Sequence, residues 1–203
     1  MLDPLTECHN PQALILVPTR ELAEQVGQEI VKLAWGCKTS VTVLAGGKHM
    51  RKQIQQLQDG AQIVVGTPGR VQDHIHRKTF NTSDLWCVVL DEADRMLDIG
   101  FRPAIERILR SCPKDRQTML LSATLPPAIQ RLTERFLVEP EHVNCSSKQV
   151  SVDTIEQRYF SVQQNQKFEL LLKLLEREQP SQAIIFCRTK RGTDRLQREL
   201  CKF

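Results

Sequence analysis

The stretch WCVVLDEADRML (residues 86–97) places an apolar run, CVVL, directly before three carboxylates, those of Asp91, Glu92 and Asp94. Acidic groups this close raise one another's pKa and repel, so the grouping is costly unless a cation or a polar network compensates for it. A short, nearly continuous apolar run suits a strand that is buried on both faces of a sheet. The stretch therefore predicts a buried strand that ends in a charged site.

Four more apolar runs of similar length occur earlier and later in the chain. They cover residues 13–17, 41–45, 62–66 and 118–122. Other segments have apolar positions that recur three and four residues apart, as in amphipathic helices. These segments cover residues 20–35, 50–58, 69–77 and 101–112. The alternation of strands and helices predicts an α/β fold, in which a parallel sheet is flanked by helices.

Each expected strand is followed at once by a short motif of small or charged residues. The motifs are PTRE after Val17, GG after Ala45, TPGR after Gly66, DEAD after Leu90 and SAT after Leu121. In open α/β sheets, ligands bind beyond the carboxyl ends of the strands. A purely structural sheet has no reason to gather such residues along one rim, so the pattern predicts a ligand site there.

The last part of the chain begins with a polar stretch, NCSSKQVSVD, that we interpret as a linker. Beyond it we expect a strand, a helix, a second strand and a second helix, which cover residues 155–162, 167–178, 183–187 and 193–200. The expected organisation has three parts: a first α/β domain at 1–143, the linker at 144–153, and the N-terminal part of a second α/β domain at 154–203.

Composition limits the class of protein. Of the 203 residues, 40% are hydrophobic and 26% are charged, which is ordinary globular usage. The formal net charge of +4 is too small to predict nucleic-acid binding by itself. The seven cysteines form no CxxC pair, so neither a disulfide framework nor a zinc site is indicated, and a reducing cytosol fits best. No apolar run approaches the roughly 18 residues of a membrane span, and we expect a soluble, cytoplasmic protein, or a nuclear one in a eukaryote.

The motifs together resemble those of the DEAD-box RNA helicases, in that family's order and at its spacings. The resemblance rests on PTRELA (18–23), GG (46–47), TPGR (67–70), DEAD (91–94), SAT (122–124) and IIFCRTK (184–190). Each string alone is a weak signal, but six in order are specific. The resemblance implies a RecA-like first domain, the start of a second RecA-like domain, and ATP-dependent RNA helicase activity.

The resemblance also implies roles for the three carboxylates of Asp91, Glu92 and Asp94. Asp91 would hold Mg²⁺, through water, and Glu92 would orient or polarise the water that attacks the γ-phosphate of ATP. Asp94 would bond to Ser122 and Thr124, and so link the hydrolytic site to the RNA surface. A bound cation would offset the clustered negative charge.

RNA contacts are implied for the loops after the first three strands. Glycines let backbone N–H groups approach phosphates, helix N-termini favour anions, and arginines can grip two oxygens at once. Such contacts are independent of base sequence and sensitive to salt. In IIFCRTK the family often has Asn where Arg188 stands, so no RNA role is carried over to Arg188. The implied RNA-binding residues are Pro18, Thr19, Arg20, Gly46, Gly47, Thr67, Pro68, Gly69 and Arg70.

Each motif has a plainer interpretation when it is taken alone. The acidic cluster could be a helix N-terminus, SAT a strand end capped by hydroxyls, and TPGR a Pro-Gly turn. At the level of function, the alternative is a non-enzymatic, truncated isoform that binds RNA or a partner of the full enzyme. A DNA-directed translocase is a third possibility, and the close match to the RNA family disfavours it.

The sequence contains no phosphate-binding GxxxxGK[ST] motif. AGGKHM (45–50) does not match it, because His49 follows Lys48. We expect the chain to be an internal piece of a longer helicase or a truncated product, weakly active or inactive alone, while the intact protein uses ATP and Mg²⁺ and acts as a monomer with possible protein regulators. In a RecA-like sheet the missing strand would leave unpaired edges and a slot in the core, so we also expect low stability or aggregation.

Overall fold

A computed structural model describes residues 10–37, 39–145, 156 and 158–202 of the chain. The chain divides into two compact units, Met1–Val143 and Asn144–Phe203. Most of the expected linker, residues 146–153, lies outside the described residues.

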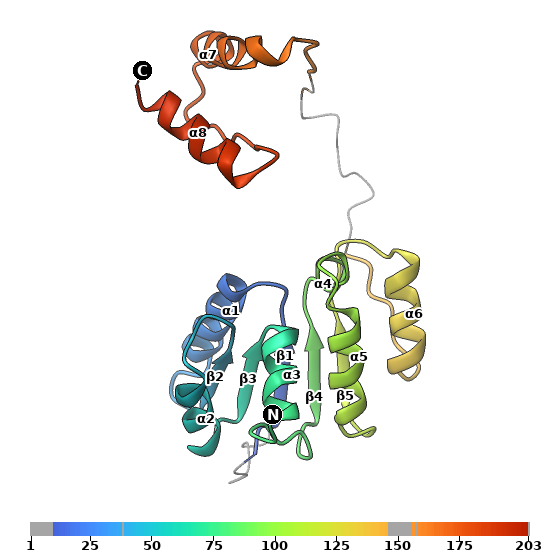
Figure 1. Ribbon diagram of the computed structural model, residues 1–203. Coiled ribbons are helices and arrows are strands. Elements are labelled where there is room, and N and C mark those ends of the chain that lie inside the picture. Colours follow the sequence, from blue (N-terminus) through green and yellow to red (C-terminus); the bar gives the residue numbers. More distant parts are fainter. Residues whose placement is uncertain (1–9, 38, 146–155, 157, 203) are drawn as a thin grey trace. The chain divides into compact units, whose positions relative to one another are not determined.

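The first unit contains a five-stranded parallel sheet with the strand order β2-β3-β1-β4-β5 (Figure 1). The backbone ladders align the last residues of the strands: Leu16 of β1 lies opposite both Gly66 of β3 and Leu90 of β4. The five carboxyl ends therefore lie along one rim, as the motifs require. All five predicted strands are confirmed, with small shifts at their ends. The strands are β1 (Ala13–Leu16), β2 (Val41–Leu44), β3 (Ile63–Gly66), β4 (Cys87–Leu90) and β5 (Gln117–Leu120).

In the described part of the first unit, six helices accompany this sheet. The four helices predicted from periodicity are confirmed to within about two residues, and α4 and α6 were not predicted. No helix in the described part of the chain is long and apolar enough to cross a membrane. The helices are α1 (Arg20–Leu33), α2 (Met50–Gln58), α3 (Pro68–His76), α4 (Ala93–Asp98), α5 (Arg102–Ser111) and α6 (Pro127–Phe136).

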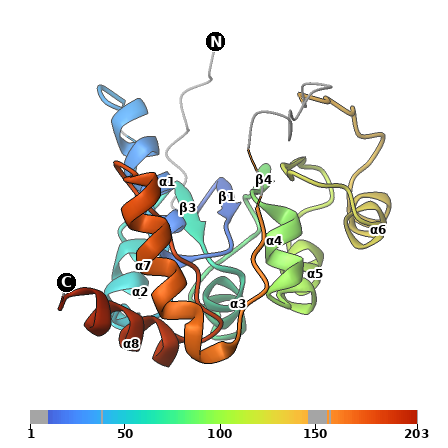
Figure 2. The same cartoon turned by 90° about the horizontal axis from the view of Figure 1, so that it is seen from above.

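The helices cover the two faces of the sheet unequally. In Figure 2, α1 lies on one side of the strands, and α3 and α5 lie on the other. Alternate strand residues divide in the same way: Leu14 and Leu16 join the large core cluster that also contains Ile105 and Ile108 of α5, whereas Ile15 packs in a small cluster with residues of α1. On the α1 side the packed cluster is smaller, and its helical members among the described residues all come from α1.

The expected slot within the sheet is wrong, because the strands pair in unbroken order. Strand β4 bonds to β1 on one side and to β5 on the other, which leaves no gap between neighbours. Among the described residues, the two edge strands are β2 and β5, and β5 is the more exposed of the two. There Met119, and Leu121 just beyond the strand, are each 45% exposed. A parallel sheet is normally covered on both faces, so β5 is the weakly protected part of this unit.

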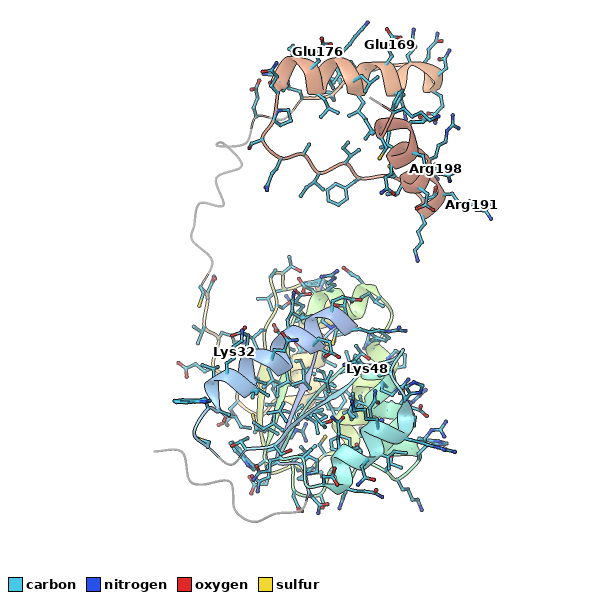
Figure 3. All side chains as sticks on the ribbon, turned by 90° about the vertical axis from the view of Figure 1, so that its left-hand side faces the viewer. Lys32, Lys48, Glu169, Glu176, Arg191 and Arg198 are labelled. Atoms are coloured by element: carbon cyan, nitrogen blue, oxygen red, sulfur yellow. The ribbon has the colours of Figure 1, made fainter. Side chains whose placement is uncertain are left out.

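The second unit contains helices but no strand among its described residues. The short 3₁₀ helix η2 (Gln164–Gln166) leads into α7 (Lys167–Glu178), and α8 (Lys190–Leu200) follows. Figure 3 labels Glu169 and Glu176 on α7 and Arg191 and Arg198 on α8. The two predicted helices are confirmed, and α8 begins three residues earlier than expected.

The strands predicted at 155–162 and 183–187 are wrong for the residues that the structure describes there. Ile184 and Phe186 are 82% and 92% exposed. A strand is stable only when neighbouring strands satisfy its backbone groups and cover its side chains, and the described part of this unit supplies neither. An apolar run indicates a preference for extended structure, but a strand also needs a neighbouring strand to pair with.

The exposed edge of β5 generates a prediction about self-association. Met119→Lys should reduce concentration-dependent association and heat-induced aggregation, because a charged side chain on an edge strand blocks pairing with another chain. Since Met119 is already half exposed, the free energy of unfolding should change by no more than about 0.5 kcal/mol. Analytical ultracentrifugation and urea titration measure the two quantities.

The adjacent residue offers a matched control. Leu120 packs against the large core cluster, so Leu120→Lys should lower the free energy of unfolding by about 2 kcal/mol or more. If Met119→Lys associates as strongly as the parent chain does, the β5 edge is not the surface through which the chains associate.

Candidate functional site

The motifs after the five strands meet along one rim of the sheet. Backbone hydrogen bonds continue past the strand ends and tie each motif to its neighbour. They run from Thr67 N to Leu44 O (3.1 Å), from Val17 N to Gly66 O (3.0 Å), from Asp91 N to Leu16 O (2.9 Å) and from Leu121 N to Leu90 O (2.8 Å). The strand order therefore places GG, TPGR and PTR next to one another in one half of the rim, and DEAD and SAT together in the other half.

Glu92 has an unusual backbone conformation. Its φ and ψ are both 49°, in the left-handed region, where residues other than glycine are uncommon. The backbone N–H of Glu92 donates to Oδ1 of Asp91 at 2.9 Å, and its carboxylate forms an ion pair with Arg95 at 3.1 Å. Such strain is frequent at functional sites, where the surrounding structure holds a side chain in place.

Asp94 connects α4 to the loop that follows β5. Its Oδ2 accepts hydrogen bonds from the backbone N–H of Thr124 at 3.0 Å and from the Thr124 hydroxyl at 2.7 Å. The bond from the Thr124 hydroxyl is the main reason that the pKa of Asp94 is lowered, against the opposing effect of partial burial. The hydroxyl of Ser122 donates to the backbone carbonyl of Thr124 at 2.7 Å. The expected link between DEAD and SAT thus runs chiefly through Thr124.

Asp91 is the carboxylate best placed to accept a cation. Among the described residues, the hydrogen bonds occupy Oδ1 of Asp91 but leave Oδ2 unpaired, while Glu92 and Asp94 bind Arg95 and Thr124. The described residues contain no cluster of three metal-ligating side chains. Mg²⁺ commonly takes only one or two carboxylates and completes its shell with water and phosphate oxygens. A single free carboxylate oxygen fits that mode of binding.

Arg20 lies against the glycine pair. A Cβ added to Gly47 would stand 2.5 Å from Nη1 of Arg20, and one added to Gly46 would stand 3.1 Å from Nη2. Gly47 also has a φ of 82°, which side-chain-bearing residues rarely adopt. The Thr19 hydroxyl caps α1 by accepting from the backbone N–H of Leu22 at 3.2 Å, so it holds the helix start from which Arg20 projects.

Arg70 joins the same half of the rim from α3. Its Nη1 donates to the backbone carbonyl of Lys48 at 3.3 Å and to Oε1 of Gln53 at 3.2 Å. Lys48, which is labelled in Figure 3, forms an ion pair with Glu24 of α1. The loop after β2 is therefore held between α1 and α3.

Three of the residues expected to contact RNA are buried. The side chains of Pro18, Thr67 and Pro68 are largely shielded from solvent. The fixed φ of proline suits Pro68 to the first turn of α3. Gly69 is exposed at the start of that helix, as the expectation requires. Pro18, Thr67 and Pro68 therefore shape the loops.

Sequence reasoning missed two residues beside the expected interface, Gln53 and His74. Both are buried and polar. Gln53 is separated by four positions from the buried Leu57 on α2, so it occupies an apolar stripe. A polar residue on such a stripe is the signal that could have identified it.

Comparison with known proteins agrees with this arrangement. The family described as DEAD/DEAH box helicase matches residues 1–132. The DEAD-box ATP-dependent RNA helicase CshA of Bacillus subtilis is 45% identical over 202 residues, and the match covers 97% of this chain and 41% of that protein. The ATP-dependent RNA helicase CshA of Listeria monocytogenes is 46% identical, over 95% of this chain and 37% of that protein. The chain thus spans about two fifths of the length of these relatives.

A solved structure supports both fold and family. The crystal structure of a DEAD box protein from the hyperthermophile Methanococcus jannaschii matches with a TM-score of 0.68 and 38% identity, over 99% of this chain and 53% of that one. The fold of the first unit is accordingly RecA-like, as expected. By its sequence and by its structure alike, the chain belongs to the DEAD/DEAH box helicase family.

Proposed function

We propose that this chain is part of an ATP-dependent RNA helicase that clamps single-stranded RNA and uses ATP hydrolysis to separate short duplexes locally. The observation that carries the proposal is the division of the rim: the strand order groups GG, TPGR and PTR in one half, and DEAD and SAT in the other. One half has the chemistry to hold a phosphate backbone, and the other has the chemistry to activate water. The ladder between β1 and β4 joins the two halves.

The proposed RNA surface consists of groups that suit phosphates. Arg20 lies against Gly46 and Gly47, and the absence of side chains at these two positions would let a phosphate approach both the guanidinium and the backbone. Arg70 and the first turn of α3, with Gly69 exposed, extend the same surface. Groups of this kind bind the sugar-phosphate backbone and not the base edges. The proposed substrate is therefore RNA of any sequence.

The proposed hydrolytic half is built around the three carboxylates. Glu92 would orient or polarise the attacking water, and its constrained backbone fixes the direction of its side chain. When bound, Mg²⁺ would neutralise charge on the ATP phosphates, and Asp91 is the residue that would hold it. Asp94 and Thr124 would transmit changes between the nucleotide and the RNA surface through the bond that joins α4 to the SAT loop.

The remaining assignments follow from the same proposal. We assign residues 1–143 to the first RecA-like domain, 144–153 to a linker and 154–203 to the start of a second such domain. We place the protein in the cytoplasm, where it acts as a monomer with protein regulators as possible partners.

Substitution of Glu92 tests the hydrolytic half. The experiment uses the full-length protein that contains this chain. There, Glu92→Gln should lower the turnover number for RNA-stimulated ATP hydrolysis by about 100- to 10,000-fold, because general-base assistance is lost. RNA affinity should be retained, since the residue lies in the other half of the rim. A coupled ATPase assay and fluorescence anisotropy with labelled single-stranded RNA measure the two effects.

The matched control is Asp98→Asn, which removes an exposed carboxylate at the end of the same short helix. It should leave turnover within about twofold of the parent value. Normal turnover in Glu92→Gln would remove the proposed role of that residue. RNA binding by a parent protein that shows no RNA-stimulated turnover would instead favour a non-enzymatic binding protein.

Substitution of Arg20 tests the RNA half. Arg20→Gln should weaken binding equally for RNAs of different sequence, because the contact is to phosphate. The slope of log affinity against log salt should become shallower by about 0.7, the value for one phosphate contact on a single strand. Arg107→Gln removes an exposed arginine of α5 and serves as the charge-matched control, with an unchanged slope. A sequence-dependent loss in Arg20→Gln would contradict the backbone-binding proposal.

A further inference from the structure

Gln53 lies at the centre of a buried polar network behind the proposed RNA surface. The residue projects from α2 and is 2% exposed. Its Nε2 donates to the backbone carbonyl of Ala45 at 2.9 Å, and its Oε1 accepts from Nη1 of Arg70 at 3.2 Å. The same oxygen lies 2.9 Å from Nε2 of His74. One amide group thus joins the end of β2, α2 and α3.

These contacts hold the loop Ala45 to Lys48 at both of its ends. Gln53 binds the carbonyl that precedes Gly46, while Arg70 binds the carbonyl of Lys48, which follows Gly47. Two adjacent glycines have few steric limits on their own backbone, so the position of this loop has to be fixed from outside. The network supplies that constraint, and it does so next to Arg20, which lies on the loop's glycines.

The hydrogen-bond pattern determines the tautomer of His74. The amide nitrogen of Gln53 is occupied by Ala45, so the group that faces His74 is the Gln53 oxygen, which can only accept. His74 therefore carries a proton on Nε2. Its Nδ1 lies 2.9 Å from the Thr79 hydroxyl oxygen, whose single proton can go either to Nδ1 or to the backbone carbonyl of His74 at 3.1 Å. In a neutral ring, Nδ1 accepts that proton. His74 is fully buried, and this burial lowers its pKa, with Arg70 as a further cause. The neutral ring is the form that fits here.

We propose that Gln53 and His74 are positioning residues for RNA binding: His74 fixes the orientation of the Gln53 amide, and the amide sets the glycine loop and Arg70 for a phosphate. The inference rests on the proposed RNA surface and extends it to residues that do not touch RNA. In the free protein the arrangement already exists, so the loop need not lose freedom when RNA binds. Pre-organisation of this kind raises affinity by lowering the cost of binding.

The first test compares variants that keep the shape of Gln53 or His74 but alter hydrogen bonding. Gln53→Met and His74→Leu remove the polar groups, and each should weaken the binding of labelled oligouridine RNA by about 5- to 10-fold. His74→Gln retains a donor directed at Gln53 and should recover most of the affinity. His76→Gln alters an exposed histidine of the same helix and should bind as the parent does.

A control for general destabilisation is needed, because buried polar groups also contribute to stability. Ile108→Val removes a methyl group from the large core cluster, away from the network, and should lower the free energy of unfolding. Thermal melts of all variants show whether its loss of stability equals that of Gln53→Met and His74→Leu. Its RNA affinity should be unchanged. Equal losses of affinity in Ile108→Val and Gln53→Met, or a failure of His74→Gln to bind more tightly than His74→Leu, would overturn the inference.

The second test is independent of RNA. The ¹⁵N chemical shifts of the His74 ring in the folded protein should show the Nε2–H tautomer, and an Nδ1–H tautomer would overturn the proposed orientation of Gln53. Arg20→Gln, measured in parallel, separates the proposed RNA surface from the proposed positioning role of Gln53 and His74. If Arg20→Gln weakens RNA binding and Gln53→Met does not, the positioning role fails while the RNA surface stands. If neither changes affinity, the RNA surface itself is misplaced and both proposals fail.

Discussion

The parallel register of the five strands is the constraint on which the site depends. Because Leu44, Gly66, Leu16, Leu90 and Leu120 are aligned across the sheet, five loops that are distant in sequence begin at one level. The backbone bonds that continue beyond the strand ends extend this alignment into the loops themselves. A slip of one residue in any strand would move its loop and turn its buried side chains to the opposite face. The burial of alternate strand residues on opposite faces therefore also keeps the loops at the carboxyl ends of the strands in position.

Helix packing then sets how the loops face one another. Gly27 lies in the middle of α1, and a Cβ there would stand 2.7 Å from Cγ2 of Val43 in β2. The glycine lets α1 approach β2 closely, and the start of the same helix carries Arg20 to the glycine loop that follows β2. A larger residue in place of Gly27 would push the helix outward, away from that loop. A packing detail inside the first unit thus affects a charged contact on its surface.

The sequence predicted the strands and most helices well because their signals are local. Runs such as 62–66 and periodic segments such as 50–58 carry their own pattern, and the structure reproduces them closely. The short helix α4 has no such signal, since it depends on the turn that the left-handed Glu92 makes after β4. The strand expected at 183–187 has the apolar pattern but lacks neighbours in the described residues, and pairing partners are a long-range property.

The candidate site divides in the same way. The motif residues are recognisable from their order along the chain. The apolar stripe of α2 could have singled out Gln53, but its contacts with Arg70 and His74 of α3 join two helices and are not encoded in a local pattern. The burial of Pro18 and Pro68 could not be predicted either. A motif sequence does not distinguish a proline that contacts a ligand from one that shapes a loop.

The three carboxylates of DEAD are tolerable as neighbours because each has a different environment. Glu92 is paired with Arg95, and Asp94 is stabilised by two donors from Thr124, which together compensate much of the local charge without any ligand. The pKa of Asp94 is lowered from its ordinary value of 3.8, so it is ionised at neutral pH, and the part of its bond strength that depends on ionisation is lost only as the pH falls below that value. Within the part of the chain that the structure describes, one carboxylate oxygen of Asp91 has no hydrogen-bond donor. Protein groups thus stabilise the charges of Glu92 and Asp94, and a bound cation would be needed mainly for the charge of Asp91, which directly follows β4.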